Sequence, residues 1–423
     1  MYIKDIEITN IRSIERFTMA FKKPAGWHVL IGDNGAGKST IIRSIALALI
    51  GPEDAPALRQ DWTDWLNKQA TKGQITVRVE GDSMYDSRTG SGKYPDHYVY
   101  TNDIEFSREK ADKLPVKIIF KNKTTPMNWK AASGWFSVAY GPFRRFTGGS
   151  PEKEKMYYSN PKAGAHLSAF GEDVALSEAL VYLRDLYIKK LENKADGELY
   201  DQLIRFINAA QLLPHNVTIQ SIDSEGVYFI DANGQTINAI QMSDGFRSML
   251  SLTFELIRQL IRTYGKNKVF KPANEASQTI DLPGVVLIDE IDAHLHPTWQ
   301  TRVGQWFTTY FPNIQFIVTT HSPLVCRAAE KGSIWRLAAP GSRQLSGEVK
   351  GTDRARLIYG NVLDAYGTEV FGQDVERSEA SKEKVQQLAH LSQLNTFGKI
   401  TDQQKKELQD LRKILITDDT TEF

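Results

Sequence analysis

The most constraining feature of this 423-residue sequence is a glycine-rich segment between two apolar runs. Residues 32–40 read Gly-Asp-Asn-Gly-Ala-Gly-Lys-Ser-Thr and match the phosphate-loop pattern G-x-x-x-x-G-K-S. Residues 27–31 are typical of a short buried strand, and residues 38–49 carry apolar side chains at helical spacing before a Gly-Pro stop. A strand, a glycine-rich turn and a helix in this order predict nucleotide binding.

Each residue type in this segment has a chemical role in holding a triphosphate. Glycine lets backbone N–H groups converge on the β-phosphate, Lys38 places a positive charge between the β- and γ-phosphates of ATP, and the Ser39 hydroxyl is a ligand for Mg²⁺. The dinucleotide pattern G-x-G-x-x-G is not met, because Thr40 stands where its third glycine belongs. The expected nucleotide-binding residues here are Gly32, Asn34, Gly35, Ala36, Gly37, Lys38, Ser39 and Thr40.

A second motif is an apolar strand that ends in two adjacent carboxylates. Residues 285–290 read Val-Val-Leu-Ile-Asp-Glu. In a P-loop protein such a strand presents one acid to the metal and another to water. We therefore expect Asp289 to hold Mg²⁺ and Glu290 to act as general base on the attacking water.

The third motif lies one strand later. Residues 314–318 are apolar enough for a strand, and Thr319-Thr320-His321-Ser322-Pro323 follows. Parallel sheets bind ligands at the carboxyl ends of their strands, so His321 is expected to reach the γ-phosphate.

The rest of the chain alternates strand and helix patterns, which indicates an α/β fold with a largely parallel sheet. The expected strands are 2–9, 14–21, 27–31, 75–79, 116–120, 136–140, 217–222, 227–230, 284–288, 314–318 and 334–337, with 83–98 as a long loop. The expected helices are 38–49, 176–191, 199–210, 245–264, 298–310 and 322–330.

Composition excludes several classes of protein. Lys plus Arg (52) nearly cancels Asp plus Glu (51), so no global charge draws the chain to nucleic acid or to anionic lipid. No apolar run approaches the roughly 20 residues of a membrane span. A single cysteine, Cys326, excludes a disulfide framework and a thiolate cluster, so we expect a cytoplasmic protein without a membrane partner.

Together these motifs resemble an ABC-type ATPase head of the SMC/RecF/OLD group, over most of residues 1–340. Residues 289–297 (Asp-Glu-Ile-Asp-Ala-His-Leu-His-Pro) resemble the Walker B and D-loop of that group, and residues 320–323 resemble its switch histidine. Residues 10–13 (Asn-Ile-Arg-Ser) resemble its N-terminal strand end, which implies that Arg12 lies near the nucleotide.

Residues 241–248 (Gln-Met-Ser-Asp-Gly-Phe-Arg-Ser) resemble the ABC signature at the start of a long helix. The free N–H groups and dipole of a helix start favour an anion, so Ser243, Asp244 and Gly245 are candidate nucleotide contacts. The resemblance implies that they serve the nucleotide of a second subunit. Two heads would then enclose two ATP molecules in a homodimer, or in a higher homo-oligomer built from such dimers.

The resemblance leaves the glutamine of a Q-loop undecided, since Gln60, Gln69 and Gln74 are all candidates. The interval between Ser39 and Ser243 is too short for a long coiled coil and holds a short helical lobe at most. The 102 residues after His321 are too few for the added nuclease domain of OLD proteins.

The expected organisation is a head over residues 1–350, with an insertion at 53–172 that forms a β-rich lobe and a helical lobe at 173–213. A C-terminal helical region follows at 351–423. Its end predicts a helical hairpin with a turn at Gly398 and a capping box at residues 401–404. The hairpin either covers the head or docks a partner. This tail is similar to those of stand-alone antiphage-defence ATPases such as PtuA of Septu and retron-linked systems, which implies a separate nuclease effector.

A nucleic-acid partner is a further hypothesis. Cations outnumber acids between residues 107 and 155, with aromatic residues interleaved, and Arg144 and Arg145 follow the strand at 136–140. A solvated face of the β-rich lobe explains the same pattern. Functionally, a regulatory switch in defence competes with a RecF-like DNA-repair ATPase. Two features argue against a transporter ATPase. One is the Leu-His-Pro sequence of the D-loop at residues 295–297, and the other is the lack of a usual Q-loop context.

Overall fold

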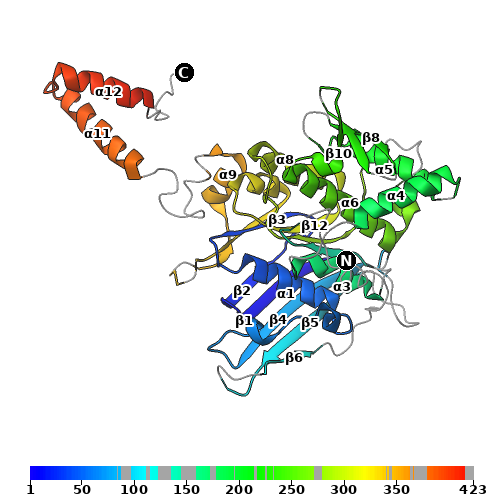
Figure 1. Ribbon diagram of the computed structural model, residues 1–423. Helices are drawn as coiled ribbons and strands as arrows, with labels where there is room; N and C mark the ends of the chain where they lie inside the picture. The colour runs from blue at the N-terminus through cyan, green and yellow to red at the C-terminus, as the bar shows by residue number, and fades with distance from the viewer. Residues whose placement is uncertain are drawn as a thin grey trace. The chain divides into compact units, whose positions relative to one another are not determined.

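The structure is a computed structural model of the whole chain (Figure 1). It describes residues 1–82, 84–86, 97–110, 115–121, 135–143, 159–171, 178–194, 196–213, 217–223, 226–231, 233–270, 279–339, 341–342, 345–362, 365 and 379–414. The chain divides into two compact units, Met1–Gly360 and Asn361–Phe423.

The first unit contains an antiparallel sheet of five strands. In spatial order these are β2 (Ile14–Ala20), β1 (Tyr2–Ile11), β4 (Lys72–Asp82), β5 (His97–Ser107) and β6 (Lys117–Phe120). Side chains alternate between a buried and a more exposed face, as the period of two in a half-buried sheet requires. The region expected to form a β-rich lobe, residues 53–172, contributes β4, β5 and β6 to this sheet, and the N-terminal strands β1 and β2 complete it.

A second sheet of the same unit carries the phosphate-loop strand. Its order is β14 (Gly347–Glu348), β13 (Gly332–Leu337), β3 (Gly26–Gly32), β12 (Ile314–Thr319), β11 (Gly284–Ile288) and β7 (Ser137–Tyr140). All neighbouring pairs are parallel except β13 with β14. The mixed, largely parallel sheet expected from the sequence is thus confirmed.

Helix α1 (Lys38–Ile50) is the centre of the core between these sheets. It has no polar face: eleven of its thirteen residues are buried. A helix that is apolar all round must be covered on all sides. In Figure 1, α1 lies between the antiparallel sheet and strands β3 and β12, and one cluster of buried side chains includes residues of all three. The buried Asn102 of β5 donates from Nδ2 to the carbonyl of Ala48, at 3.1 Å.

The other face of the mixed sheet is covered by α8 (Pro297–Tyr310) and by a 3₁₀ helix, η6 (Pro323–Lys331). Close packing here requires a glycine: a Cβ at Gly304 would lie 2.5 Å from the Cβ of Ala328 and 2.7 Å from the ring of Trp27. Helices on both faces bury the parallel strands, which explains their continuous apolar sequences.

Helices and a small sheet complete the first unit. The helical lobe pairs α4 (Glu178–Leu191) with α5 (Gly197–Ala209), and α4 packs on the long α6 (Asp244–Tyr264). The small antiparallel sheet has the order β10 (Thr236–Asn238), β9 (Val227–Ile230) and β8 (Thr218–Ile222). The remaining elements are η1 (Ala55–Leu58), η2 (Thr63–Trp65), α3 (Pro161–His166), η3 (Leu167–Ala169), η5 (Ala239–Gln241), α7 (Lys266–Val269) and α9 (Gly351–Tyr359). Helix α9 packs on η6 and belongs to this unit.

The second unit contains the C-terminal hairpin, α11 (Glu379–Thr396) and α12 (Asp402–Ile414). Leu391, Leu408 and Leu411 form its buried cluster. Gly398 turns the chain at φ 66°. The capping box is present, because the Thr401 N–H donates to Gln404 Oε1 and the Gln404 N–H donates back to Thr401 Oγ1.

Two local expectations were wrong. The loop expected at 83–98 ends earlier, because His97 and Tyr98 already belong to β5, a strand that the sequence analysis did not predict. The α-helix expected at 322–330 is the 3₁₀ helix η6. Within the described residues, no helix has the length and apolar character needed to cross a bilayer.

Candidate nucleotide site

The sequence-predicted motifs meet at one edge of the mixed sheet. Strands β3, β12, β11 and β7 are parallel and adjacent, so their carboxyl ends lie side by side. In register, Thr319 pairs with Leu30, and Ile288 pairs with both Val318 and Tyr140. The phosphate loop, the Asp289-Glu290 pair and the segment before His321 therefore leave the sheet at the same edge.

The phosphate loop connects β3 directly to α1, as expected. Gly37 is the residue before α1 and has a left-handed conformation, with φ 99° and ψ 14°. A Cβ at this position would also lie 2.9 Å from Ile14 Cγ1. Glycine is thus required both by the backbone conformation and by the close approach of Ile14, the first residue of β2. Residues 33–35 are exposed, whereas Ala36, Lys38 and Thr40 are buried.

Lys38 reaches back across the loop. Its Nζ donates to the carbonyl of Gly32 at 2.7 Å and to that of Asp33 at 3.1 Å. Burial lowers the pKa of Lys38, while the nearby Asp289, Glu290 and further carboxylates raise it in part.

Asp289 and Glu290 are held by Thr319, a residue that the sequence analysis missed. Asp289 is 2% exposed, and Thr319 Oγ1 donates to its Oδ1 at 2.6 Å. The same hydroxyl accepts from the Glu290 N–H at 2.7 Å. Glu290 has φ 49°, a left-handed conformation that is uncommon outside glycine and is enriched at functional sites. The only sequence signal for Thr319 was its place directly before Thr320-His321.

His321 follows β12 and has an exposed side chain. Its backbone N–H donates to Asp292 Oδ2 at 3.3 Å, which links it to the segment after Glu290. Asp292 was quoted in the D-loop resemblance but was not given a role. Ser322 caps η6, since its Oγ accepts from the Leu324 N–H at 3.3 Å.

Arg12 lies at the turn after β1, next to the residues that contact the phosphate loop. Its guanidinium is 5.0 Å from the centre of the Trp65 ring, and its backbone N–H donates to the Trp65 carbonyl. Burial lowers the pKa of Arg12, as does the nearby charge of Arg43 on α1. The Arg12 guanidinium therefore lies over the Trp65 ring.

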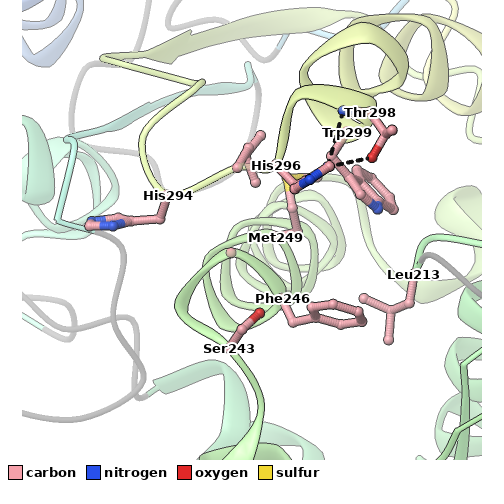
Figure 2. Close-up of a pocket in the computed structure, with 10 residues that line it drawn as sticks. Leu213, Ser243, Phe246, Met249, His294, His296, Thr298 and Trp299 are labelled. Atoms are coloured by element: carbon pink, nitrogen blue, oxygen red, sulfur yellow. Dashed lines mark hydrogen bonds between the residues drawn. The ribbon is translucent and has the colours of Figure 1, made fainter.

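The signature-like residues Ser243, Asp244 and Gly245 lie at the start of α6. Ser243 is the N-cap residue, is exposed, and makes no side-chain capping bond. Asp244 pairs with Arg247. The nearest atoms to a Cβ at Gly245 belong to His294 and Leu295, with the His294 carbonyl at 2.6 Å. Figure 2 shows Ser243 on α6 and His294 on the neighbouring segment.

Other candidates lie outside this edge. Gln60 Nε2 donates to the carbonyls of Leu58 and Phe170, and Gln74 Nε2 donates to Thr76. In the basic stretch, Arg108 donates to Asn67 and Ala70, and Lys121 pairs with Glu105. Several of its cations lie outside the described residues, namely Lys113, Lys123, Lys130, Arg144, Arg145, Lys153 and Lys155.

Comparison with known proteins finds relatives among ATPases. "Septu protein PtuA" of Bacillus mycoides is 28% identical over 342 residues, which cover 79% of this chain and 40% of the relative. "Retron Ec83 probable ATPase" of Escherichia coli is 26% identical over 398 residues, which cover 79% of this chain and 71% of the relative. "Retron Vc95 probable ATPase" of Vibrio cholerae is 41% identical over 359 residues, which cover 70% of this chain and 66% of the relative. The chain thus spans well under half of the Bacillus mycoides relative, and the similarity to Septu and retron ATPases expected from the tail is confirmed.

Among solved structures, an SMC head bound to the C-terminal winged-helix domain of ScpA matches with a TM-score of 0.49 and 17% identity. The match covers 84% of this chain and 99% of the SMC head. An SMC head domain from Thermotoga maritima matches with a TM-score of 0.44 and 14% identity, covering 83% and 99%.

Two family models match the sequence. The one described as "AAA domain, putative AbiEii toxin, Type IV TA system" matches residues 164–327. The one described as "AAA domain" matches residues 5–244, more than half of the 423 residues, and includes the phosphate loop. The chain therefore belongs to the AAA-domain family and is an ATPase.

Proposed function

We propose that this ATPase is a regulatory switch of antiphage defence. Two heads close around two ATP molecules, each site is built from both chains, and a separate nuclease is the effector. The names of the Septu and retron relatives support the defence role. The edge that gathers the phosphate loop, Asp289, Glu290 and the His321 segment supports ATP hydrolysis as the step that resets the switch.

In this proposal the phosphate loop and Lys38 bind the phosphates, while His321 and Arg12 approach the γ-phosphate and the nucleotide. Glu290 takes a proton from the attacking water. Mg²⁺ would be held by Ser39 Oγ and Asp289, and when bound it neutralises negative charge on the phosphate oxygens. These residues fit the ion, since Mg²⁺ is usually held by one or two protein oxygens together with substrate phosphates, and Asp289 is a buried carboxylate oriented by Thr319.

The proposal that two heads form a dimer rests on the start of α6. Its first N–H groups lack a side-chain cap, and Ser243 and Asp244 are exposed. A helix of 21 residues directs a positive dipole end toward an anion at such a site. A Cβ at Gly245 would meet the 294–295 segment of the same chain. From the resemblance to ABC-type heads we infer that a phosphate bound at the start of α6 belongs to the nucleotide of a second chain.

Sedimentation velocity of Glu290→Gln tests this dimer, because slow hydrolysis should preserve the ATP-bound state. With ATP and Mg²⁺ the variant should have a higher sedimentation coefficient than with ADP, and the increase should correspond to a doubling of its mass. Adding Ser243→Arg should remove the shift, and Gln220→Arg, at an exposed position of β8, should keep it. An unchanged sedimentation coefficient with ATP, despite measured ATP binding, would refute the two-chain site.

The defence role is tested separately. Cells that carry the gene with its native neighbours should resist phage, and Lys38→Ala should remove that resistance. A nuclease encoded beside the gene should co-purify with the wild-type protein. Recombination genes as neighbours, with no effect on phage plating, would instead favour the DNA-repair function.

A further inference from the structure

The starts of two helices open into one pocket of about 400 Å³. The first turn of α6 contributes Ser243, Gly245 and Phe246, and the start of α8 contributes His296 and Thr298. Figure 2 shows Ser243 on α6 and His296 directly before α8. The helices are 21 and 14 residues long, and each has its positive dipole end at its start. The pocket therefore joins the proposed phosphate contact on α6 to a second positive helix end.

The start of α6 is in contact with the segment that leads into α8. A Cβ at Gly245 would lie 2.6 Å from the His294 carbonyl oxygen and 3.8 Å from the Cα of Leu295. His296 is the next residue, and consecutive Cα atoms are about 3.8 Å apart. A phosphate bound by the first N–H groups of α6 would therefore be within reach of the side chain of His296.

The His296 ring is held by one nitrogen and leaves the other available. Its Nδ1 lies 2.9 Å from Thr298 Oγ1 and accepts from the Thr298 N–H at 3.4 Å, which caps α8. A neutral ring whose Nδ1 accepts carries its proton on Nε2, so Nε2 is a donor in the neutral ring as well as in the charged one. The side chain is exposed, and in the described part of the chain this Nε2 has no hydrogen-bond partner.

The rest of the pocket favours such a donor. The described lining contains no Asp, Glu, Lys or Arg, so no carboxylate repels a phosphate and no stronger cation competes for it. Phe246, Met249 and Trp299 give the pocket apolar walls, beside which a hydrogen bond to an anion is stronger than in open water. Figure 2 shows the ring of His294 directed away from Phe246 and Met249, which leaves His296 as the candidate.

We propose that His296 donates from Nε2 to a phosphate oxygen of the nucleotide held by the second chain of the dimer. Ser243 and the first N–H groups of α6 contact the same phosphate group. The inference rests on the two-chain site of the proposed function and adds to it a residue that acts on the nucleotide of the other chain.

Two substitutions of His296 separate contact with the nucleotide from capping of α8. Asparagine is a good cap whose side chain ends short of the Nε2 position, whereas glutamine places an amide N–H near that position and is too long for a usual cap. In the Glu290→Gln background with ATP and Mg²⁺, His296→Asn should raise the dissociation constant of the dimer about ten-fold or more. His296→Gln should keep this constant within about three-fold. Urea unfolding should give the opposite order, with His296→Gln the less stable variant.

Matched heterodimers show which chain's nucleotide His296 contacts. All chains carry Glu290→Gln, and each pair contains one Lys38→Ala and one His296→Asn. In the first pair these two changes are on different chains, so the intact phosphate loop faces an intact His296. In the second pair they are on the same chain, so the intact loop faces the substituted position. Sedimentation with ATP and Mg²⁺ should find the first pair about ten-fold more tightly associated.

The proposal is wrong if Glu290→Gln dimerises with ATP and the addition of His296→Asn leaves the dissociation constant unchanged. It is also wrong if His296→Gln weakens the dimer more than His296→Asn does, or if the second heterodimer associates as tightly as the first. Failure of Glu290→Gln itself to dimerise, despite measured ATP binding, would instead refute the two-chain site on which this inference rests.

Discussion

Thr319 Oγ1 donates to Asp289 Oδ1 at 2.6 Å and accepts from the backbone N–H of Glu290 at 2.7 Å. One hydroxyl on β12 thereby fixes both the side chain of one acidic residue and the backbone of the next. Thr319 is fully buried, and Asp289 is nearly so. The carboxylate that we assign to Mg²⁺ is thus oriented by a neighbouring hydroxyl, as metal ligands usually are by their outer partners.

Thr319→Val should impair ATP hydrolysis without removing nucleotide binding. Valine keeps the shape but leaves Asp289 Oδ1 and the Glu290 N–H without this partner. We expect kcat to fall about 10- to 100-fold, the Mg²⁺ concentration for half-maximal rate to rise, and stability to fall by about 1–3 kcal/mol. Steady-state phosphate release over a Mg²⁺ titration measures the first two effects. Thr319→Ser, which retains the hydroxyl, is the control and should stay near wild type; equal rates for both variants would exclude the orienting role.

Lys38→Ala and Glu290→Gln should separate binding from hydrolysis. Lys38 is the cation of the phosphate loop, so its removal should abolish binding of a fluorescent ATP analogue. Glu290→Gln keeps Asp289 and should bind ATP normally while hydrolysis slows by at least 100-fold, since a general base contributes about 10²–10⁴. A wild-type rate of phosphate release from Glu290→Gln would show that another group is the base.

Composite sites predict rescue when two inactive variants are mixed. Lys38→Ala and Ser243→Arg disable opposite halves of a site, so their heterodimer should contain one intact site. ATPase activity should therefore reappear on mixing. A wild-type and Lys38→Ala heterodimer is the control that shows whether one intact site suffices. If that control is active and the mixture of confirmed heterodimers stays inactive, the two-chain arrangement is incorrect.

The parts of the fold that follow local patterns were predictable from the sequence. The strand, turn and helix around Lys38 and the apolar strand before Asp289 are continuous segments with strong periodicity. Strand β5 was missed because Asn102 and Asp103 look like a turn, yet Asn102 points to the core and donates to Ala48 on α1. Only the tertiary partner explains a buried asparagine in a strand.

The 3₁₀ geometry of η6 and the role of Thr319 depend on contacts that no local pattern reveals. In η6 the carbonyl of Val325 accepts from Trp27 Nε1, and that of Ala329 accepts from Arg354, so these carbonyls are bonded outside the helix. Thr319 and Asp289 are 30 residues apart and meet because β12 and β11 pair in register. The motifs could be found in the sequence, whereas the hydroxyl that orients them could not.

Acid should destabilise the first unit through buried histidines. Burial lowers the pKa of His166 and of His28 to about 4, from about 6.5 in an unfolded chain. Between these values the unfolded chain binds protons that the folded chain does not, so stability falls as pH falls from about 6.5 to 4. Each histidine should cost up to about 2 kcal/mol at pH 5 relative to pH 7.

Urea unfolding followed by tryptophan fluorescence measures this loss, because all eight tryptophans precede residue 336. His166→Gln should reduce the loss between the two pH values by about 2 kcal/mol. His390→Gln, at an exposed position of α11, should leave it unchanged. The same pH dependence in His166→Gln as in wild type would assign the acid sensitivity to other groups.

Deleting residues 378–423 should leave a soluble, active ATPase. The hairpin buries Leu391, Leu408 and Leu411 in a cluster of its own, and residues Met1–Gly360 form a compact unit that includes the whole candidate nucleotide site. Because the hairpin has a buried cluster of its own, we expect it to dock a partner or neighbouring head dimers. Truncation should therefore preserve the rate of phosphate release and remove higher oligomers or the co-purifying effector. Leu408→Glu, which disrupts the hairpin without shortening the chain, should give the same result. Loss of solubility together with ATPase activity would instead make the hairpin part of the head's core, and retention of activity, oligomers and partner alike would exclude both roles.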